Sequence, residues 1–216
     1  MIARLHYITE DISSHTPPEL ARLACLGGVK WVQLRMKKQP AEQWGIFVAE
    51  TLKVCREFGA KLIINDHVAL AAKHAVDGVH LGKTDMPVEE ARKILGPDFI
   101  IGATANSLSD LELIAHTSAN YIGLGPFRFT TTKENLSPVL GADGIASLVS
   151  QFKKISSLPV IAIGGIKKED IMPLMKTGVY GIALSSAINH DKHPDEAARI
   201  VIQEMENASE LYTLIK

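Results

Sequence analysis

One pattern repeats along the whole chain and limits its fold more than any other feature: a short apolar run followed by a helical pattern, eight times over. The runs show no alternation of polar and apolar residues, which favours parallel strands buried on both faces. The predicted strands are Leu5–Thr9, Trp31–Leu34, Leu62–Asn65, Gly78–Leu81, Ile100–Gly102, Tyr121–Leu124, Val160–Ile163 and Gly181–Leu184. The predicted helices cover residues 17–26, 41–58, 67–75, 87–95, 107–117, 142–154, 168–177 and 194–206.

Strict alternation of eight strands and eight helices predicts an α/β fold in which a parallel sheet closes on itself, the (β/α)8 or TIM barrel. A doubly wound open sheet is the alternative, but it usually carries a glycine fingerprint in its first strand–helix turn. The turn here, Glu10 to Ser14, has no glycine. Since the chain has 216 residues and no linker-like stretch, we expect one domain spanning residues 1–216.

Composition excludes several classes of function. The formal net charge of −1 gives no reason to expect binding to nucleic acid. No run of about 20 apolar residues is present, so no membrane-spanning helix is expected. The first residues, Met1 to His6, lead into a strand and lack the layout of a signal peptide. Cys25 and Cys55 lie on apolar faces of predicted helices, which indicates buried free thiols and a cytoplasmic location.

Two carboxylates follow neighbouring strands of the predicted barrel. Asp66 ends the third strand run, and Asp85 comes shortly after the fourth. Parallel neighbours place both acids at the same end of the sheet, where barrel enzymes build their sites. Two adjacent carboxylates suggest a hard cation such as Mg²⁺. Taken singly, each acid is equally well explained as the cap of the following helix.

Two cations follow the second strand. Arg35 and Lys37 share a strand parity, so both are expected at the mouth of the barrel. A planar guanidinium and a point-like ammonium together suit a polyanion. Pairing with acidic residues of neighbouring loops is the alternative, and these two residues alone leave it open. Beside Asp66 and Asp85, they indicate a diphosphate held with a divalent metal.

The later strands end in neutral or hydroxyl-bearing residues. Thr104 and Asn106 follow the fifth strand and are weak signals by themselves. The longest irregular stretch, residues 125–141, carries Thr130, Thr132 and Lys133, a set suited to binding phosphate while closing over a ligand.

A glycine and two serines complete a second region. Gly165 follows the seventh strand, and Ser185 and Ser186 follow the eighth. Loops at these two positions form phosphate sites in many barrels. One charged and one neutral phosphate region at the same mouth are what an enzyme joining two phosphorylated substrates would need.

The chain resembles the thiamine-phosphate synthase family, also called thiamine-phosphate pyrophosphorylase. The matching motifs are Val32–Lys37, Ile64–Asp66, Asp77–Gly82 leading to Asp85, Tyr121–Pro126 followed by Thr130, Thr132 and Lys133, and Ala162–Ile166. The resemblance implies a (β/α)8 fold, Mg²⁺ as cofactor, and a dissociative alkyl transfer. In that reaction, a hydroxyethylthiazole phosphate displaces diphosphate from a hydroxymethylpyrimidine diphosphate to give thiamine phosphate.

The same resemblance implies a role for each matching residue. Asp66 and Asp85 resemble the metal ligands. Arg35, Lys37, Asn65 and Lys133 resemble the diphosphate clamp, with Arg35, Lys37 and Lys133 as the catalytic cations. Gln33 is expected to meet the pyrimidine, and Thr104 stands where a serine is common. Thr130, Thr132, Gly165 and Ser186, with Ser185 as a neighbour, resemble the thiazole-phosphate site.

Three positions depart from the family pattern. Asn106 stands where many members of the superfamily have histidine, His67 stands where arginine is frequent, and Arg128 is expected to add a charge near the site. A thiazole tautomerase of the same superfamily is one alternative function, but it needs an acid–base group and Asn106 cannot titrate. A catalytically silent ligand-binding regulator is another. The sequence leaves the oligomeric state open, with a homo-oligomer among the alternatives.

Overall fold

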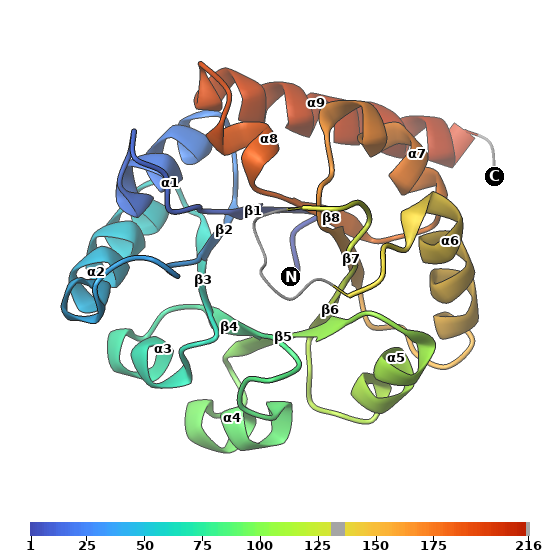
Figure 1. Cartoon of the computed structure of the whole chain (residues 1–216), viewed down its shortest axis with the longest axis horizontal. Coiled ribbons are helices and arrows are strands. Elements are labelled where there is room, and N and C mark those ends of the chain that lie inside the picture. The colour runs from blue at the N-terminus through green and yellow to red at the C-terminus, as the bar shows by residue number, and fades with distance from the viewer. Residues whose placement is uncertain (131–136, 215–216) are drawn as a thin grey trace.

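Eight parallel strands form a closed barrel in which each strand pairs with its neighbours in sequence and β8 pairs with β1 (Figure 1). The computed structural model describes residues 1–130 and 137–214. The strands are β1 (Leu5–Ile8), β2 (Trp31–Leu34), β3 (Lys61–Asn65), β4 (Gly78–Leu81), β5 (Ile100–Ala105), β6 (Tyr121–Leu124), β7 (Val160–Ile163) and β8 (Gly181–Leu184). The (β/α)8 architecture expected from the alternating pattern is confirmed.

Helices surround the barrel on its outside (Figure 1). They are α1 (Pro17–Leu26), α2 (Ala41–Glu57), α3 (Val68–His74), α4 (Val88–Leu95), α5 (Leu108–Ala115), α6 (Gly141–Phe152), the 3-10 helix η1 (Lys168–Asp170), α7 (Ile171–Lys176), α8 (Ser186–Asn189) and α9 (Pro194–Leu214). Ser107 caps α5 by accepting a hydrogen bond from the backbone of Asp110. Pro194 begins α9, as its sequence punctuation predicts.

The predicted boundaries were wrong at a few elements. Strand β5 continues to Ala105, three residues beyond the predicted end, because the polar Thr104 is part of the ladder and pairs with Gly123. The predicted seventh helix begins as the 3-10 turn η1, and α8 was not predicted because four residues are too few to show a helical period. The last helix reaches Leu214.

An inner layer of side chains fills the barrel. Trp31 on β2 belongs to the same buried cluster as Tyr121 on β6 and Ile161 on β7, although β2 is adjacent to neither strand, so these side chains meet across the interior. Their bulk requires small neighbours. A Cβ at Gly102 would lie 2.1 Å from the ring of Tyr121, and one at Gly123 would lie 3.0 Å from His80. Glycine at these two positions therefore makes room for the aromatic rings.

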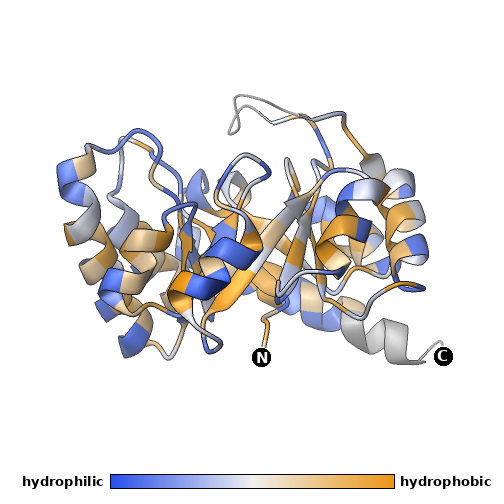
Figure 2. Cartoon of the chain, turned by 90° about the horizontal axis from the view of Figure 1, so that it is seen from below, coloured by the Kyte–Doolittle hydropathy of each residue, from blue (hydrophilic) through white to orange (hydrophobic). Residues whose placement is uncertain are grey.

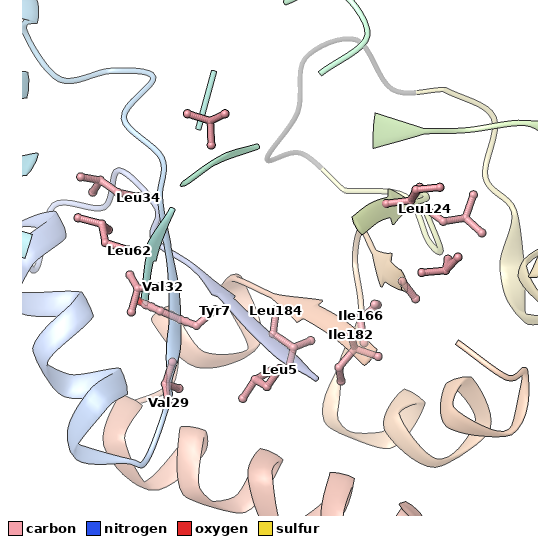
Figure 3. Packing of buried hydrophobic residues seen from close by; sticks show 14 of the residues in the cluster. Leu5, Tyr7, Val29, Val32, Leu34, Leu62, Leu124, Ile166, Ile182 and Leu184 are labelled. Carbon is pink, nitrogen blue, oxygen red and sulfur yellow. The ribbon is translucent and has the colours of Figure 1, made fainter. Parts of the chain in front are cut away.

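An outer layer packs the strands against the helices. Its side chains have the opposite parity to those of the inner layer and join a continuous apolar cluster, with Tyr7, Val32 and Leu184 among its members (Figure 3). Hydrophobic residues therefore gather along the central strands in Figure 2. Cys25 and Cys55 are buried in this layer as free thiols, as predicted. In the described part of the chain, no helix is both long and apolar enough to cross a membrane.

The inner layer contains a histidine that should make stability depend on pH. His6 stacks on Trp31 with ring centroids 4.3 Å apart. Burial and, secondarily, the nearby His80 lower the pKa of His6 from 6.5 to about 3. The unfolded chain therefore binds this proton more readily than the folded protein, and the free energy of unfolding falls as the pH drops below about 6.5.

We expect His6→Phe, which keeps a ring on Trp31, to weaken that dependence. The stability lost between pH 7 and pH 5 should be about 2 kcal/mol smaller in the variant than in the parent. Urea unfolding at the two pH values measures the difference. His116→Gln alters an exposed histidine and serves as the control. An equal loss in parent and His6→Phe would contradict the assignment.

Candidate active site at the barrel mouth

The carboxyl ends of β2 and β3 bring together five of the predicted site residues. Gln33 has the parity of the inner layer, and its side-chain amide donates to Asn65 Oδ1 at 2.7 Å. Two residues further along the chain, Arg35 is half-buried, and its backbone N–H donates to the hydroxyl of Thr9 at 2.9 Å. The ammonium of Lys37 forms an ion pair with Asp66.

Asp66 has an unusual backbone. Its φ of 66° lies in the left-handed region, which non-glycine residues adopt rarely and aspartate tolerates better than most. The backbone N–H of Asp66 donates to the carbonyl of His80 on β4, so the turn is fixed to the neighbouring strand. Such conformations concentrate at functional sites. The turn aims the carboxylate toward the cation of Lys37 instead of capping α3, whose N-cap position is His67.

Asp85 is a close neighbour of Asp66. Burial raises the pKa of the Asp85 carboxyl, and so do a hydrogen bond to Asp66 and the charge of that carboxylate. The backbone N–H of Gly82 donates to Asp85 Oδ2 at 2.6 Å and holds the side chain in place. Because burial and the charge of Asp66 make ionisation of Asp85 more costly, the pair forms a site for a positive charge, part of which Lys37 supplies.

The donor set fits a hard divalent cation. Carboxylate oxygens are the ligands that Mg²⁺ prefers, and it commonly binds through one or two of them together with water and phosphate oxygens. Among the described residues, no group of three or more histidine, cysteine or acidic side chains is placed to hold a metal by itself. Asp66 and Asp85 are therefore residues that could hold Mg²⁺ only together with oxygens of a ligand and water.

Thr104 and Asn106 differ in what they contact. The Thr104 hydroxyl lies at the mouth, 3.1 Å from Nε2 of His80. The side-chain amide of Asn106 donates to the carbonyl of Gly125, and its backbone N–H donates to Asp110. Asn106 thus connects the end of β5 to the end of β6 and provides no titratable group.

A hollow of about 430 Å³ lies on the other side of the mouth, beside the ends of β7 and β8. Three predicted residues line it: Thr130, Gly165 and Ser186. Ser185 is not part of this lining, and its hydroxyl is within hydrogen-bond reach of Glu10 and Asn189. Thr132 and Lys133 lie outside the described residues, so their predicted roles stay predictions.

Several residues of the site were missed from the sequence. Asp11 accepts hydrogen bonds from the backbone N–H groups of Lys37 and Lys38 at 2.7 and 2.8 Å, which shapes the loop after β2. Glu10 lines the hollow and forms an ion pair with His190 at 3.1 Å. Both acids lie in the first strand–helix turn, directly after β1. Their position after a strand was the available signal.

Arg128, which was expected to add a charge near the site, lines the hollow and is paired with an acid. Its guanidinium makes two hydrogen bonds to the buried Asp170, at 2.7 and 2.8 Å. Asp170 also accepts from the backbone of Lys167. The ion pair between Arg128 and Asp170 therefore connects the segment after β6 to the turn after β7 at the wall of the hollow.

Comparisons with known proteins agree on one family. The model of the thiamine monophosphate synthase family matches residues 5–188. A thiamine-phosphate synthase of Bacteroides thetaiotaomicron is 48% identical over 92% of this chain and 95% of its own. One from Flavobacterium johnsoniae is 42% identical over 95% of both chains. The structure of a thiamine phosphate pyrophosphorylase from Pyrococcus furiosus matches with a TM-score of 0.85 and 31% identity, covering 95% of this chain and 96% of that one.

The carboxylate pair should reduce the stability of the metal-free protein. Since the folded state raises the pKa of Asp85, its charged form is disfavoured at neutral pH. Asp85→Asn keeps an acceptor for Gly82 and removes the charge. After allowance for solvent screening, we expect the Tm in metal-free buffer at pH 7 to rise by about 1–2 °C.

The rise in Tm of Asp85→Asn should disappear near pH 3, because Asp85 is then protonated in both the folded and the unfolded protein. Differential scanning calorimetry at both pH values tests this. Asp98→Asn, at an exposed carboxylate, is the matched control and should leave the Tm unchanged. A lower Tm for Asp85→Asn at pH 7 would show that the pair is not mutually repulsive.

Proposed function

The chain belongs to the thiamine monophosphate synthase family, and from that premise we propose that it is a transferase that makes thiamine phosphate. Its substrates are a hydroxymethylpyrimidine diphosphate and a hydroxyethylthiazole phosphate, and diphosphate is the second product. One observation carries this proposal: the mouth has a charged region at β2–β4 and a separate hollow at β6–β8, suited to two different phosphorylated molecules.

The charged region suits the diphosphate. Arg35 and Lys37 provide a fork and a point charge for phosphate oxygens, and Asn65 provides an amide beside them. Lys37 reaches the diphosphate by leaving Asp66, its ion-pair partner in the ligand-free chain. Gln33 lies deeper than these residues and suits the pyrimidine ring. Lys133 remains part of this clamp as a prediction from the sequence.

Asp66 and Asp85 would hold Mg²⁺ next to this clamp. When bound, the ion supplies positive charge that stabilises the departing diphosphate. The carboxylates are held for this task by backbone contacts, through the left-handed turn at Asp66 and the Gly82 N–H at Asp85. Fixed positions matter because preorganised charges lose little free energy to reorganisation during the reaction.

The hollow suits the thiazole phosphate. Gly165 allows a close approach of the backbone, and the hydroxyls of Thr130 and Ser186 are donors for phosphate oxygens. Thr132 extends this set in the sequence. The ion pair between Arg128 and Asp170 holds one wall of the hollow in place.

The proposed reaction requires placement more than acid–base catalysis. The bond between the pyrimidine methylene carbon and the diphosphate oxygen breaks, and the electron pair leaves with the diphosphate. A bond between that carbon and the thiazole nitrogen then forms. Holding both reactants at one mouth makes the second step effectively unimolecular. Asn106, which is bound to Gly125 and cannot titrate, supports this reaction over a tautomerase.

Three further attributes belong to this proposal. We propose that residues 1–216 act as one domain and that the protein works in the cytoplasm, where free thiols such as Cys25 and Cys55 persist. A homo-oligomer is compatible with a site built from one chain. None of these three attributes changes the chemistry.

The direct test is an assay with both phosphorylated substrates and Mg²⁺. The purified protein should release diphosphate and form thiamine phosphate in equal amounts, and EDTA should stop both. Asp85→Asn should lower kcat by at least about 100-fold while the fold is retained. Asp98→Asn should behave as the parent. Absence of diphosphate release by the parent would end the synthase proposal, and full activity of Asp85→Asn would end the metal assignment.

Substitutions of the two serines after β8 should have different effects. Ser186→Ala removes a donor from the hollow, so we expect KM for the thiazole phosphate to rise about tenfold with KM for the pyrimidine diphosphate unchanged. Ser185→Ala should instead lower the Tm, because its hydroxyl contacts Glu10 and Asn189. Steady-state kinetics with each substrate varied in turn measures the two KM values separately. An equal rise in both KM values would contradict the assignment of the hollow to the thiazole phosphate.

A further inference from the structure

A chain of three polar side chains leads from the barrel interior to the mouth. The hydroxyl of Tyr121, on β6, lies 3.1 Å from Nδ1 of His80, on β4. Nε2 of the same ring lies 3.1 Å from the hydroxyl of Thr104, on β5 between them. Tyr121 is 1% exposed and His80 is 7% exposed, whereas Thr104 is half-buried at the mouth.

Burial sets the direction of the first hydrogen bond. Desolvation raises the pKa of Tyr121 well above its usual value, so the phenol keeps its proton. A buried O–H requires an acceptor, and His80 Nδ1 is its hydrogen-bond partner within the residues that the structure describes. The phenol therefore donates to Nδ1. The opposite direction would use the phenol oxygen as acceptor and leave its own proton without a partner.

The first hydrogen bond determines the second. A neutral imidazole that accepts at Nδ1 carries its proton on Nε2. Nε2–H then donates to the oxygen of Thr104, so the proton of the Thr104 hydroxyl points away from His80. Packing restricts the rings that make this arrangement. Tyr121 lies edge-on to Trp31 at 5.5 Å and stacks on His80 at 5.4 Å.

We propose that Tyr121 and His80 are positioning residues that fix the Thr104 hydroxyl as a hydrogen-bond donor to the first substrate. The acceptor is a ring nitrogen or a phosphate oxygen of the pyrimidine diphosphate, both of which lack protons at neutral pH. This inference rests on the proposed function for the identity of the substrate. The polarity of Thr104 itself follows from the ligand-free structure.

The tautomer of His80 can be measured without any substrate. Protein labelled with ¹⁵N in its histidines is examined by two-dimensional NMR at pH 7.5, and His80→Gln identifies the signal. We expect Nδ1 without a proton and Nε2 with one. The Nδ1–H tautomer, or a charged ring, would overturn the proposal. This result does not depend on catalysis, so it stands even if the protein fails to make thiamine phosphate.

Kinetics test the connection between Tyr121 and Thr104. We expect Thr104→Val to raise KM for the pyrimidine diphosphate about tenfold with a smaller effect on kcat, and Thr104→Ser to restore it. Tyr121→Phe should raise the same KM about threefold in the parent and leave it unchanged in the Thr104→Val background. Additive effects of the two substitutions would show that Tyr121 acts only through packing. If Tyr121→Phe does not fold, His80→Leu replaces it, because it removes the donor to Thr104; it should raise the same KM about threefold in the parent and leave it unchanged in the Thr104→Val background.

A binding measurement separates the two acceptors. Inorganic diphosphate, with Mg²⁺, is titrated into the parent and into Thr104→Val by calorimetry. Weaker binding by the variant identifies a phosphate oxygen as the acceptor, whereas unchanged binding combined with the higher KM identifies the ring. Unchanged diphosphate binding together with an unchanged KM would overturn the role of Thr104.

Discussion

Closure of the eight-stranded sheet is the constraint on which the rest of the structure depends. In a closed barrel, every second residue of each strand points into an interior of fixed size, so large and small side chains must alternate around it. Trp31 and Tyr121 fill that space, and Gly102 and Gly123 leave it open for rings. The same parity continues beyond the strand ends. The register that packs the core therefore also aims Arg35 and Asn65 into the mouth.

Electrostatics divides the mouth into two regions. At β3 and β4, the carboxylate of Asp66 is close enough to Asp85 to disfavour the charged form of Asp85, and Lys37 offsets part of that cost. Around the hollow, opposite charges instead neutralise each other, as Arg128 does with Asp170. The first region thus favours a further positive charge, whereas the second offers a hollow with neutral hydroxyl donors. The metal-bound diphosphate of the proposed reaction would supply that charge.

The sequence predicted the architecture well because each strand is a compact apolar run, and seven of the eight predicted strands lie within one residue of the observed bounds. Strand β5 was predicted too short because Thr104 resembles a loop residue unless its inward direction is known. Asp66 and Asp85 were found because both follow strands. Asp11 was missed although its place directly after β1 was an available signal. The contact between His80 and Tyr121 was missed because it depends on which side chains meet inside the barrel, and spacing in one strand does not contain that information.

Gly102 shows how a residue without a side chain can control the polarity of a distant hydroxyl. A Cβ at this position would lie 2.5 Å from the hydroxyl of Tyr121 and would push the phenol away from His80. The missing methyl group thus preserves the proton arrangement that ends at Thr104, two residues further along the same strand. A substitution at Gly102 would damage packing and hydrogen-bond polarity together.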